Sequence, residues 1–222
     1  MTSVVIAIDG PAGAGKGTIA KYLATYYGLK HLDTGLLYRL LGYKANQQNV
    51  PLNHIDALMT IAETLDFKDL NNPILRHEHI GNLASQIAIL PQVREFLTKI
   101  MQGFCQNIFE PYQGVVLDGR DIGTVVCPNA DLKIFITADS QTRLQRRNLE
   151  LKFRAIEAEI NLSEIHERDE RDENRATAPL VMASEAHLID TTNLSIEQAC
   201  KQACKLVEDI LKLKPQIQNK HA

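Results

Sequence analysis

The stretch GPAGAGKGT at residues 10–18 constrains the fold of this 222-residue chain more than any other feature. It follows the apolar, β-branched run VVIAI at residues 4–8 and precedes a segment with helical periodicity at residues 16–27. Glycines permit a positive φ, so successive backbone N–H groups can converge on phosphate oxygens. The helix N-terminus adds partial positive charge, and Lys16 adds a full charge. Strand, loop and helix in this order therefore predict a phosphate-binding loop.

Every residue of this loop is a candidate ligand of nucleotide phosphates: Gly10, Pro11, Ala12, Gly13, Ala14, Gly15, Lys16, Gly17 and Thr18. The loop departs from the pattern GxxxxGK[ST], because Gly17 stands where a Ser or Thr would hold Mg²⁺ and the hydroxyl comes one residue later. We therefore expect Mg²⁺ to be held mainly by phosphates and water, and we assign it no protein ligand. The alternative is a glycine-rich turn without a ligand, but four glycines are costly to order without an anion.

Similar apolar runs recur at residues 115–117, 132–136 and 187–189, separated by segments of helical periodicity. Such runs suit strands that are buried on both faces. Their alternation with helices predicts a parallel sheet with right-handed crossovers. We therefore expect an α/β fold of the three-layer P-loop type, with a central parallel sheet.

Apolar spacing predicts two of the helices. Ile19, Leu23 and Tyr26 lie on one face of the helix that follows the loop, and that face is expected to meet the core. Pro91 is well placed to open a helix that runs to about Phe109.

Capping residues indicate two further helix starts. Ser140 is expected to cap the helix after the run at residues 132–136. Ser195 and Gln198 form a capping box for the last helix, which should end before Pro215. The remaining residues, 215–222, are expected to fray.

Composition and charge narrow the class of protein. Lysine and arginine number 24 against 27 acidic residues, so the net charge of −3 gives no global positive field toward nucleic acid or an acidic membrane. No stretch reaches the roughly 18 to 20 apolar residues of a membrane span, and no signal peptide is evident. We expect a soluble, cytoplasmic monomer whose basic residues gather locally to meet a polyanion.

The four cysteines, Cys105, Cys127, Cys200 and Cys204, are too few and too scattered for a disulfide framework. Cys200 and Cys204 lie one helical turn apart, a spacing that suits a metal. Without a nearby histidine they are better interpreted as small buried hydrophobes.

The run HERDERDENR at residues 166–175 is the densest charge cluster. Arg168, Arg171, Asp172 and Arg175 are spaced to share one helical face. A solvated helix with internal ion pairs is the alternative. Beside a phosphate loop, however, planar guanidinium groups suit a phosphoryl-transfer site.

Arg143, Arg146 and Arg147 precede this run on the helix expected after residue 140, and they add further donors. Some of the three are expected to cover apolar surface or face solvent. Two segments do not fit the simple alternation of strand and helix. Residues 46–90 look like an insertion, and residues 150–180 look like a lid.

The remaining motifs are LDTGLLYR at residues 32–39, PQVRE at 91–95 and LDGRDIGTVVCP at 117–128. With the loop and the run ERDERDENRA, and in the same order, they resemble bacterial cytidylate kinases, which are nucleoside monophosphate kinases. The resemblance covers residue 4 to about residue 206. It implies transfer of phosphate from ATP to CMP or dCMP by one P-loop kinase domain.

The resemblance also implies an organisation and residue roles. The core would comprise residues 1–33, 110–149 and 181–214, with an acceptor-binding insertion at about 34–109 and a lid at about 150–180. The implied contacts of the acceptor nucleotide are Thr34, Arg39, Arg94, Asp121, Arg168, Asp172 and Arg175. The implied catalytic residues, which stabilise charge on the transferred group, are Lys16, Arg120 and Arg171.

A carboxylate at Asp121 can accept a hydrogen bond from the exocyclic amine of cytosine, whereas a uracil carbonyl has no proton to offer. Other acidic residues stay ambiguous. Asp33 either contacts a ligand or caps the following helix, and Asp118 and Arg120 either serve the site or pair with each other across the strand end.

The chain departs from the family pattern at residues 67–78, where an insertion long enough for a small antiparallel sheet is usual. Only about a dozen residues occupy that interval here, so the insertion looks shortened.

Two other functions stay open from the sequence. One is a different small-molecule kinase on the same scaffold, such as a shikimate or gluconate kinase. The other is a regulatory nucleotide-binding module whose arginine cluster contacts RNA. Against the second, the basic residues are interleaved with acids, and aromatic residues that stack on bases make up only 5% of the chain.

Overall fold

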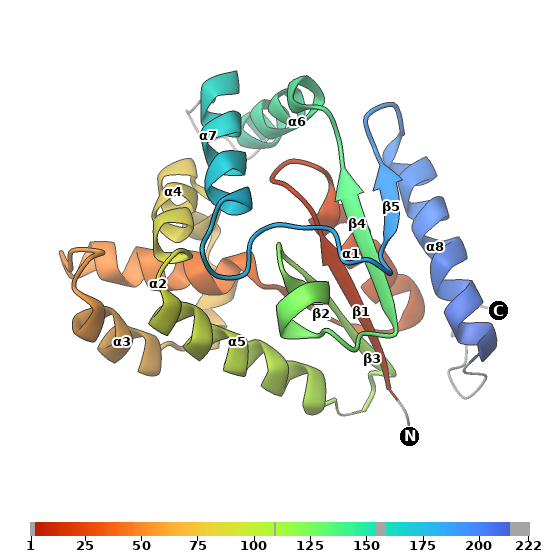
Figure 1. Cartoon of the computed structure of the whole chain (residues 1–222), viewed down its shortest axis with the longest axis horizontal. Helices are drawn as coiled ribbons and strands as arrows, with labels where there is room; N and C mark the ends of the chain where they lie inside the picture. The colour runs from red at the N-terminus through yellow and green to blue at the C-terminus, as the bar shows by residue number, and fades with distance from the viewer. Residues whose placement is uncertain (1–2, 109, 154–158, 214–222) are drawn as a thin grey trace.

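A computed structural model describes residues 3–108, 110–153 and 159–213, and Figure 1 shows its arrangement. Within these residues a five-stranded sheet runs through the molecule in the order β2-β3-β1-β4-β5, and every pairing is parallel. The strands are β1 (Val4–Asp9), β2 (Lys30–Asp33), β3 (Gly114–Asp118), β4 (Leu132–Thr137) and β5 (His187–Asp190). The predicted parallel sheet is confirmed.

Strand β1 lies at the centre of the sheet because it is apolar on both faces. Ile6 pairs with Val116 on one side and with Leu132 on the other, and all three are buried. The edge strand β2 was not among the predicted strands. Its sequence KHLD carries a single apolar residue, so pairing with β3, rather than local hydrophobicity, extends this segment.

Helices cover both faces of the sheet, as Figure 1 shows. Ile6 and Ile8 pack with α1 (Lys16–Tyr27) and α8 (Ile196–Leu213), whereas Ala7 packs against helices of the other face. That second layer contains α2 (Gly35–Gln47), α3 (Ile55–Glu63), α4 (Glu78–Ile87) and α5 (Pro91–Gln106). The three-layer expectation is therefore confirmed.

The predicted core face of α1 is right for two of its three residues. Ile19 and Leu23 are buried, but Tyr26 is 38% exposed and its neighbour Tyr27 is 2% exposed. Tyr27 takes the core position because its ring packs beneath α8, where its hydroxyl donates to the Cys204 carbonyl at 3.3 Å. The prediction for Tyr26 is wrong by one position of the helix.

The cysteines of α8 lie where their hydrophobic interpretation places them. Cys200 is buried in the core beneath α1, and Cys204 packs partly buried against the same cluster.

The helix starts divide between a confirmed cap and a corrected one. Ser195 and Gln198 form the predicted capping box: the Gln198 amide donates to Ser195 Oγ at 3.1 Å, and the Ser195 amide donates to Gln198 Oε1 at 2.9 Å. At α6 (Ser140–Phe153) the cap is Asp139 rather than Ser140, since Asp139 Oδ1 accepts from the Thr142 amide at 2.8 Å. Serine lies one residue inside the helix, so the prediction for Ser140 is wrong.

The interval expected to be a shortened insertion contains two turns of 3₁₀-helix, η1 (Phe67–Asn71) and η2 (Pro73–Arg76). Neither residues 67–78 nor their neighbours within the insertion contribute a strand to the described sheet. Leu75 anchors this segment, because it is buried with Leu40 and Ile80.

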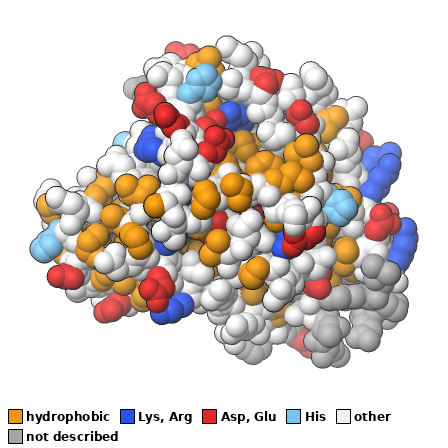
Figure 2. Space-filling model, in the orientation of Figure 1, with side chains coloured by type: hydrophobic (Ala, Val, Ile, Leu, Met, Phe, Trp, Pro, Cys, Tyr) orange, Lys and Arg blue, Asp and Glu red, His pale blue; other side chains and the backbone are white. Residues whose placement is uncertain are grey.

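The charge-rich segment forms α7 (Leu162–Glu173), which begins at a complete capping box between Asn161 and Glu164. The expected helix end at Phe109, residues 154–158 near the start of the expected lid, and the tail at residues 215–222 lie outside the described residues. No helix among the described residues is both long and apolar enough to span a bilayer. Figure 2 shows acidic and basic side chains interspersed on the visible face.

Candidate active site

The glycine-rich loop lies between β1 and α1 and has backbone conformations that glycine favours. Gly10 adopts φ 142°, and a Cβ there would lie 1.9 Å from the Ile136 carbonyl oxygen. Gly15 adopts φ 97° as the N-cap of α1, and no side chain caps the helix. The first N–H groups of α1 therefore stay available to an anion at the helix N-terminus.

Lys16 is buried at the start of α1, where its Nζ donates to the Pro11 carbonyl at 2.6 Å. Burial lowers the pKa of Lys16 well below its usual value. A lysine ammonium in this environment is poorly hydrated, so an incoming phosphate would satisfy it.

A cavity of about 870 Å³ opens over the loop. Its lining combines the loop residues Ala12 to Thr18 with charged side chains from several elements. The arginines are Arg39, Arg76, Arg120, Arg146, Arg147 and Arg168, and the acidic residues include Asp33, Glu78 and Asp118. The loop and the arginine cluster, which are far apart in sequence, thus face one space. Gly10 and Pro11 lie at the base of the loop and are not part of this lining.

Asp9, at the end of β1, joins the loop to a segment that follows β3. Its two carboxylate oxygens accept from the amides of Ile122 and Gly123, both at 2.7 Å. Burial raises the pKa of Asp9 to about 6 despite these two hydrogen bonds. The amides belong to η3 (Ile122–Val126), a single π-helical turn that Asp121 precedes.

Asp118 ends β3 and contacts His31 rather than Arg120. His31 Nε2 and Asp118 Oδ1 are 2.6 Å apart, and burial raises the pKa of Asp118. Thr34 Oγ1 donates to the Asp118 carbonyl at 2.8 Å, so the Thr34 hydroxyl serves the backbone here. The possible pairing of Asp118 with Arg120 is not the one formed.

Asp33 contacts an arginine, Arg76 of η2, instead of capping α2. Its Oδ2 lies 2.8 Å from Arg76 Nη1, and Thr34 occupies the N-cap position. Asp33 therefore does not cap α2, and this residue lines the cavity.

Arg120 and Asp172 form a buried pair between the end of β3 and α7. Arg120 Nε donates to Asp172 Oδ2 at 2.7 Å. Burial alone would raise the pKa of Asp172, but the charges of Arg120, Arg168 and Arg175 outweigh it and hold that pKa below its usual value. Burial lowers the pKa of Arg168, whose guanidinium also lies 3.6 Å from Glu78.

Arg94 and Asp121 form the second buried pair, with side chains only 3% and 7% exposed. Arg94 Nη2 donates to Asp121 Oδ2, and Arg94 Nη1 donates to the Ala88 carbonyl at 3.1 Å. The Tyr38 ring lies 5.7 Å from the Arg94 guanidinium carbon. This pair connects the insertion to the core.

Arg39 is held by the backbone of the η2 segment. Its Nη1 donates to the carbonyls of Leu75 at 2.6 Å and His77 at 3.1 Å. Burial lowers the pKa of Arg39 to about 9. Gly81 packs against this guanidinium so closely that a Cβ would lie 2.6 Å from Arg39 Nη2.

The three arginines of α6 all have defined contacts, so the expectation that some face solvent is wrong. Arg143 donates to both carboxylate oxygens of Asp169, at 2.9 and 2.5 Å, and to the Ala12 carbonyl at 3.3 Å. Arg146 Nη1 donates to Thr191 Oγ1 at 2.8 Å. Arg143 is held by α7 and the loop, Arg146 by Thr191 after β5 and Arg147 by Glu78 of α4, so polar partners on other elements draw the three side chains away from solvent.

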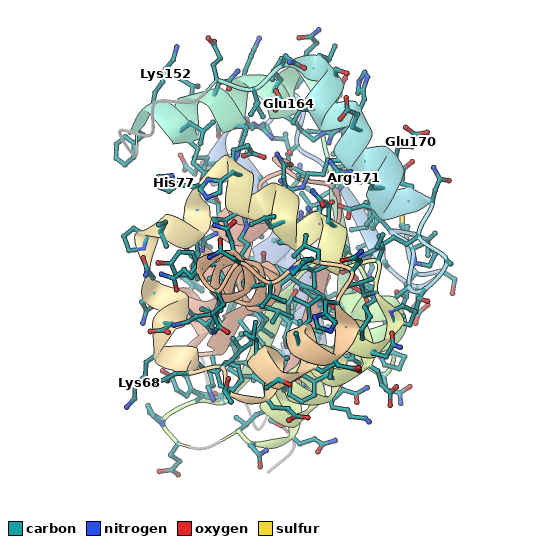
Figure 3. The ribbon with its side chains drawn as sticks, turned by 90° about the vertical axis from the view of Figure 1, so that its left-hand side faces the viewer. Lys68, His77, Lys152, Glu164, Glu170 and Arg171 are labelled. Carbon is teal, nitrogen blue, oxygen red and sulfur yellow. The ribbon has the colours of Figure 1, made fainter. Side chains whose placement is uncertain are left out.

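Arg147 connects α6 to the start of α4. Its Nη2 donates to Glu78 Oε2 at 2.6 Å. Figure 3 shows α6 and α7 lying above α4, with Glu170 directed outward from α7. Arg147 and Glu78 thus join α6, which begins in the expected core, to the expected insertion.

The residues of the 166–175 run do not all share one environment. Arg168 lines the cavity and Asp172 is buried, whereas Arg175 lies beyond the end of α7. Arg171 Nε donates to the Glu167 carbonyl of its own helix at 3.1 Å, and Arg171 is not part of the described cavity lining. The structure therefore brings Lys16 and Arg120 to the cavity but not Arg171.

Several buried polar atoms have no hydrogen-bond partner among the described residues: Tyr38 Oη, Ser85 Oγ, Thr124 Oγ1, Arg168 Nε, and Arg175 Nε and Nη2. Such atoms are costly unless a ligand or water satisfies them. Tyr38 and Ser85 were missed from the sequence. The position of Tyr38 within LDTGLLYR, one helical turn after Thr34, was the available signal.

Metal-binding side chains are sparse. Across residues 3–108, 110–153 and 159–213, no group of three or more His, Cys, Asp or Glu side chains could hold a metal ion. Thr18 and Asp118 supply a hydroxyl and a carboxylate to the lining of the cavity. This donor set suits a hard cation that takes most of its ligands from phosphates and water.

A parallel sheet, a glycine-rich loop at the end of its central strand and an arginine-lined cavity over that loop define the class of P-loop kinases. Within that class the chain belongs to the cytidylate kinase family, whose model matches residues 6–209. It is 44% identical to a cytidylate kinase of Bartonella quintana (strain Toulouse), covering 96% of this chain and 98% of that one. It is 45% identical to a cytidylate kinase of Bradyrhizobium sp. (strain ORS 278), covering 93% and 97%.

Solved structures of more distant proteins share the fold. A gluconokinase from Sinorhizobium meliloti 1021 superposes with a TM-score of 0.55 at 11% identity, covering 97% of this chain and 98% of that one. The protein TT1252 from Thermus thermophilus superposes with a TM-score of 0.54 at 16% identity, covering 95% and 99%. At these identities the similarity establishes the fold alone.

Proposed function

We propose that this chain transfers the γ-phosphoryl group of ATP to CMP, giving CDP and ADP, and that it also accepts dCMP. The observation that carries the proposal is the joining of two features: near full-length membership of the cytidylate kinase family, and a cavity shared by the phosphate loop and the arginine cluster. The cavity is lined by basic residues interleaved with acidic ones, and this arrangement supports a small-molecule substrate rather than nucleic acid. We further propose that the protein acts as a monomer in the cytoplasm.

The donor side is assigned to the phosphate loop. Residues 10–18 would bind the ATP phosphates through backbone N–H groups and through the Lys16 ammonium. Mg²⁺ would be held mainly by phosphates and water and would supply charge neutralisation at the phosphates. The Thr18 hydroxyl and the Asp118 carboxylate line the cavity and are the side chains that would assist, an addition to the sequence expectation of no protein ligand.

The acceptor side is assigned to the insertion, at about residues 34–109, together with the lid, at about 150–180. Arg39, Arg94 and Arg168 carry the positive charge for the CMP phosphate, joined by Arg175, whose guanidinium has unsatisfied donors. Asp121 would accept from the cytosine amine, and Asp172 would accept from ribose hydroxyls. Thr34 supports the site through the Asp118 carbonyl.

No protein nucleophile is required for this reaction. A CMP phosphate oxygen attacks the γ-phosphorus in line while charge spreads over the equatorial oxygens. Lys16 and Arg120 lie at the cavity and would stabilise that charge. We leave Arg171 out of this role because its guanidinium contacts its own helix instead. Closure of the lid would exclude water, so ATP would not be hydrolysed.

Acceptor specificity tests the proposal directly. Purified protein with ATP and Mg²⁺ is assayed for coupled ADP release against CMP, dCMP, UMP and AMP. The expected result is turnover with CMP and dCMP well above that with UMP or AMP. Turnover with AMP alone would overturn the proposal.

A different small-molecule kinase on this scaffold would not need Asp121. We expect Asp121→Asn to raise the KM for CMP by at least about 10-fold while the KM for ATP changes little. An unchanged KM for CMP in a folded Asp121→Asn variant would favour that alternative. Salt-sensitive RNA binding without kinase activity would favour the regulatory module.

A further inference from the structure

Two cysteines that are far apart in the sequence meet in the structure. Cys105 lies in the last turn of α5, and Cys127 directly follows η3. Their Sγ atoms are 2.9 Å apart, both thiols are free, and both residues are partly exposed. The two cysteines are 22 positions apart in the sequence, so only the fold brings them together.

The same two elements are connected at three points. Arg94 of α5 pairs with Asp121 before η3, Gln102 Nε2 donates to the Val126 carbonyl at 3.3 Å, and the two thiols meet at the far end. We call this line of contacts the α5–η3 seam. It joins the insertion to the core, and one of its ends carries the ion pair proposed to contact the acceptor.

The backbone beside Cys127 is well fixed. Its amide donates to the Ile122 carbonyl at 2.7 Å, and its carbonyl accepts from the Ala130 amide at 2.9 Å. A disulfide requires a sulfur separation of about 2.05 Å, so the two Sγ atoms must close by less than about 1 Å. Rotation of the side chains supplies a movement of that size.

The two thiols differ in acidity. The hydrogen bond from Cys127 lowers the pKa of the Cys105 thiol, whereas the same hydrogen bond and burial raise the pKa of the Cys127 thiol. Cys105 is therefore the thiol that forms a thiolate, and the thiolate is the form that attacks a peroxide.

We propose that Cys105 and Cys127 form a reversible intramolecular disulfide in response to a peroxide, and that this bond fastens the insertion to the core along the α5–η3 seam. The consequence for catalysis rests on the proposed function, because it assumes that the insertion binds the acceptor nucleotide. Formation of the disulfide does not depend on the proposed function.

The chemistry balances with one hydrogen peroxide. The Cys105 thiolate attacks one peroxide oxygen, the O–O bond breaks, and a sulfenic acid forms while the released hydroxide takes up a proton to become water. The Cys127 sulfur then attacks the sulfenic sulfur, so the S–S bond forms, the S–O bond breaks and a second water leaves. Two thiols are oxidised by two electrons in total, and peroxide is reduced to two waters.

Peptide mapping tests the bond itself. The full chain is treated with hydrogen peroxide, the remaining thiols are blocked, and non-reducing digests are analysed by mass spectrometry. We expect a Cys105–Cys127 cross-link that dithiothreitol reverses, with Cys200 and Cys204 still present as blocked thiols. Oxidation of Cys105 without a cross-link, or a cross-link elsewhere, would overturn the proposal.

Variants in which one cysteine is replaced by serine provide matched controls. Cys127→Ser should abolish the cross-link and leave Cys105 open to sulfinic acid formation, whereas Cys204→Ser should preserve the cross-link. Wild-type protein alone gives an independent readout that needs no variant. Because the bond closes a loop, the oxidised form should melt roughly 5 to 10 °C higher than the reduced form. A melting temperature that does not rise in fully cross-linked protein would contradict the fastening.

Activity separates this inference from the proposed function. In reduced protein, turnover of CMP tests the function alone. In fully cross-linked protein, we expect kcat with CMP to fall by about 3- to 10-fold, with the KM for ATP unchanged, because the insertion is restrained. An unchanged kcat would overturn control by the seam. A protein that forms the cross-link but phosphorylates CMP in neither the reduced nor the cross-linked state would refute the proposed function and leave the disulfide proposal standing.

Discussion

The phosphate loop and the arginine cluster face the same cavity but are built in opposite ways. The loop is one continuous stretch whose binding groups are backbone N–H groups at the start of α1. The cluster consists of the six arginines that line the cavity. They come from α2, η2, the end of β3, α6 and α7, and most of them contact a carboxylate. The loop needs only its own conformation, whereas the cluster needs the whole fold.

The difference shows how each region bears the cost of charge burial. Backbone dipoles carry no full charge, so the N–H groups of the loop can stay without an anion at little desolvation cost. Most of the cluster's guanidinium groups have a carboxylate as counter-charge, as in Arg120 with Asp172 or Arg147 with Glu78. An arriving nucleotide phosphate would compete with these carboxylates. Charge in the cluster is thus neutralised in advance, and charge in the loop is not.

The strongest test of the comparison is removal of the only full charge in the loop. Lys16→Met should lower kcat by about 10³-fold, because the proposed reaction places the ammonium where charge develops on the transferred group. The stability of the fold should not fall, since a buried ammonium is replaced by an apolar side chain. Steady-state kinetics and urea unfolding measure the two effects.

Lys99→Met is the matched control, because Lys99 is exposed on α5 and pairs with Glu95 of the same helix. Its kcat should stay within about twofold of wild type. A similar loss in both variants would show that the charge of Lys16 has no special role.

Asp9, which joins the loop to the amides of Ile122 and Gly123, predicts a pH dependence. The pKa of Asp9 is raised to about 6 by burial, so the folded protein holds this proton between about pH 4 and pH 6 while the unfolded chain releases it. Stability from this group therefore falls as pH rises through that window, by about 3 kcal/mol. Asp9→Asn removes the titration.

Urea unfolding across the window measures the difference between wild type and Asp9→Asn. Any constant cost of the amide cancels, and the wild type should lose about 3 kcal/mol relative to the variant between about pH 4 and pH 7. Parallel stability curves would contradict a raised pKa at Asp9.

Removing a counter-charge tests the cluster side. Asp172→Asn leaves the Arg120 guanidinium without its charged partner at 2.7 Å, so kcat/KM for CMP should fall by about 10- to 100-fold. Glu170→Gln on the same helix is the control, because Glu170 points outward (Figure 3). Equal effects of the two substitutions would indicate a general charge effect of α7.

The smallest expected effect comes from the helix that carries three of the arginines. Asp139→Ala removes the N-cap of α6 and should cost about 1 kcal/mol of unfolding free energy, measured by urea denaturation. Ser140→Ala should cost less, because Ser140 lies inside the helix. The reverse order would restore the cap that the sequence predicted.

The same contrast explains how much the sequence revealed. The loop, four of the five strands and the three-layer arrangement were predictable, because each depends on a short local pattern. The edge strand β2 was not, since KHLD becomes a strand only through its pairing with β3. Tyr26 and Tyr27 show the limit of periodicity: adjacent, similar residues are distinguished only by the packing of α8.

The cluster was predictable in its residue types but not in its contacts. The sequence allowed Asp118 to pair with Arg120, yet His31 and Asp172 are the partners, and both come from other elements. Arg171 shared the expected face of the 166–175 run but contacts its own helix. No sequence pattern marks Glu78 as a site residue, and only the fold brings it to Arg147.

Arg143 gives this arrangement a consequence for the order of events. One guanidinium contacts the Ala12 carbonyl in the loop and the Asp169 carboxylate in α7. A backbone shift at Ala12 would therefore change the position that α7 prefers, and a movement of α7 would act back on the loop. Thermodynamic reciprocity then requires that a ligand at either region change the affinity of the other region for its ligand by the same factor.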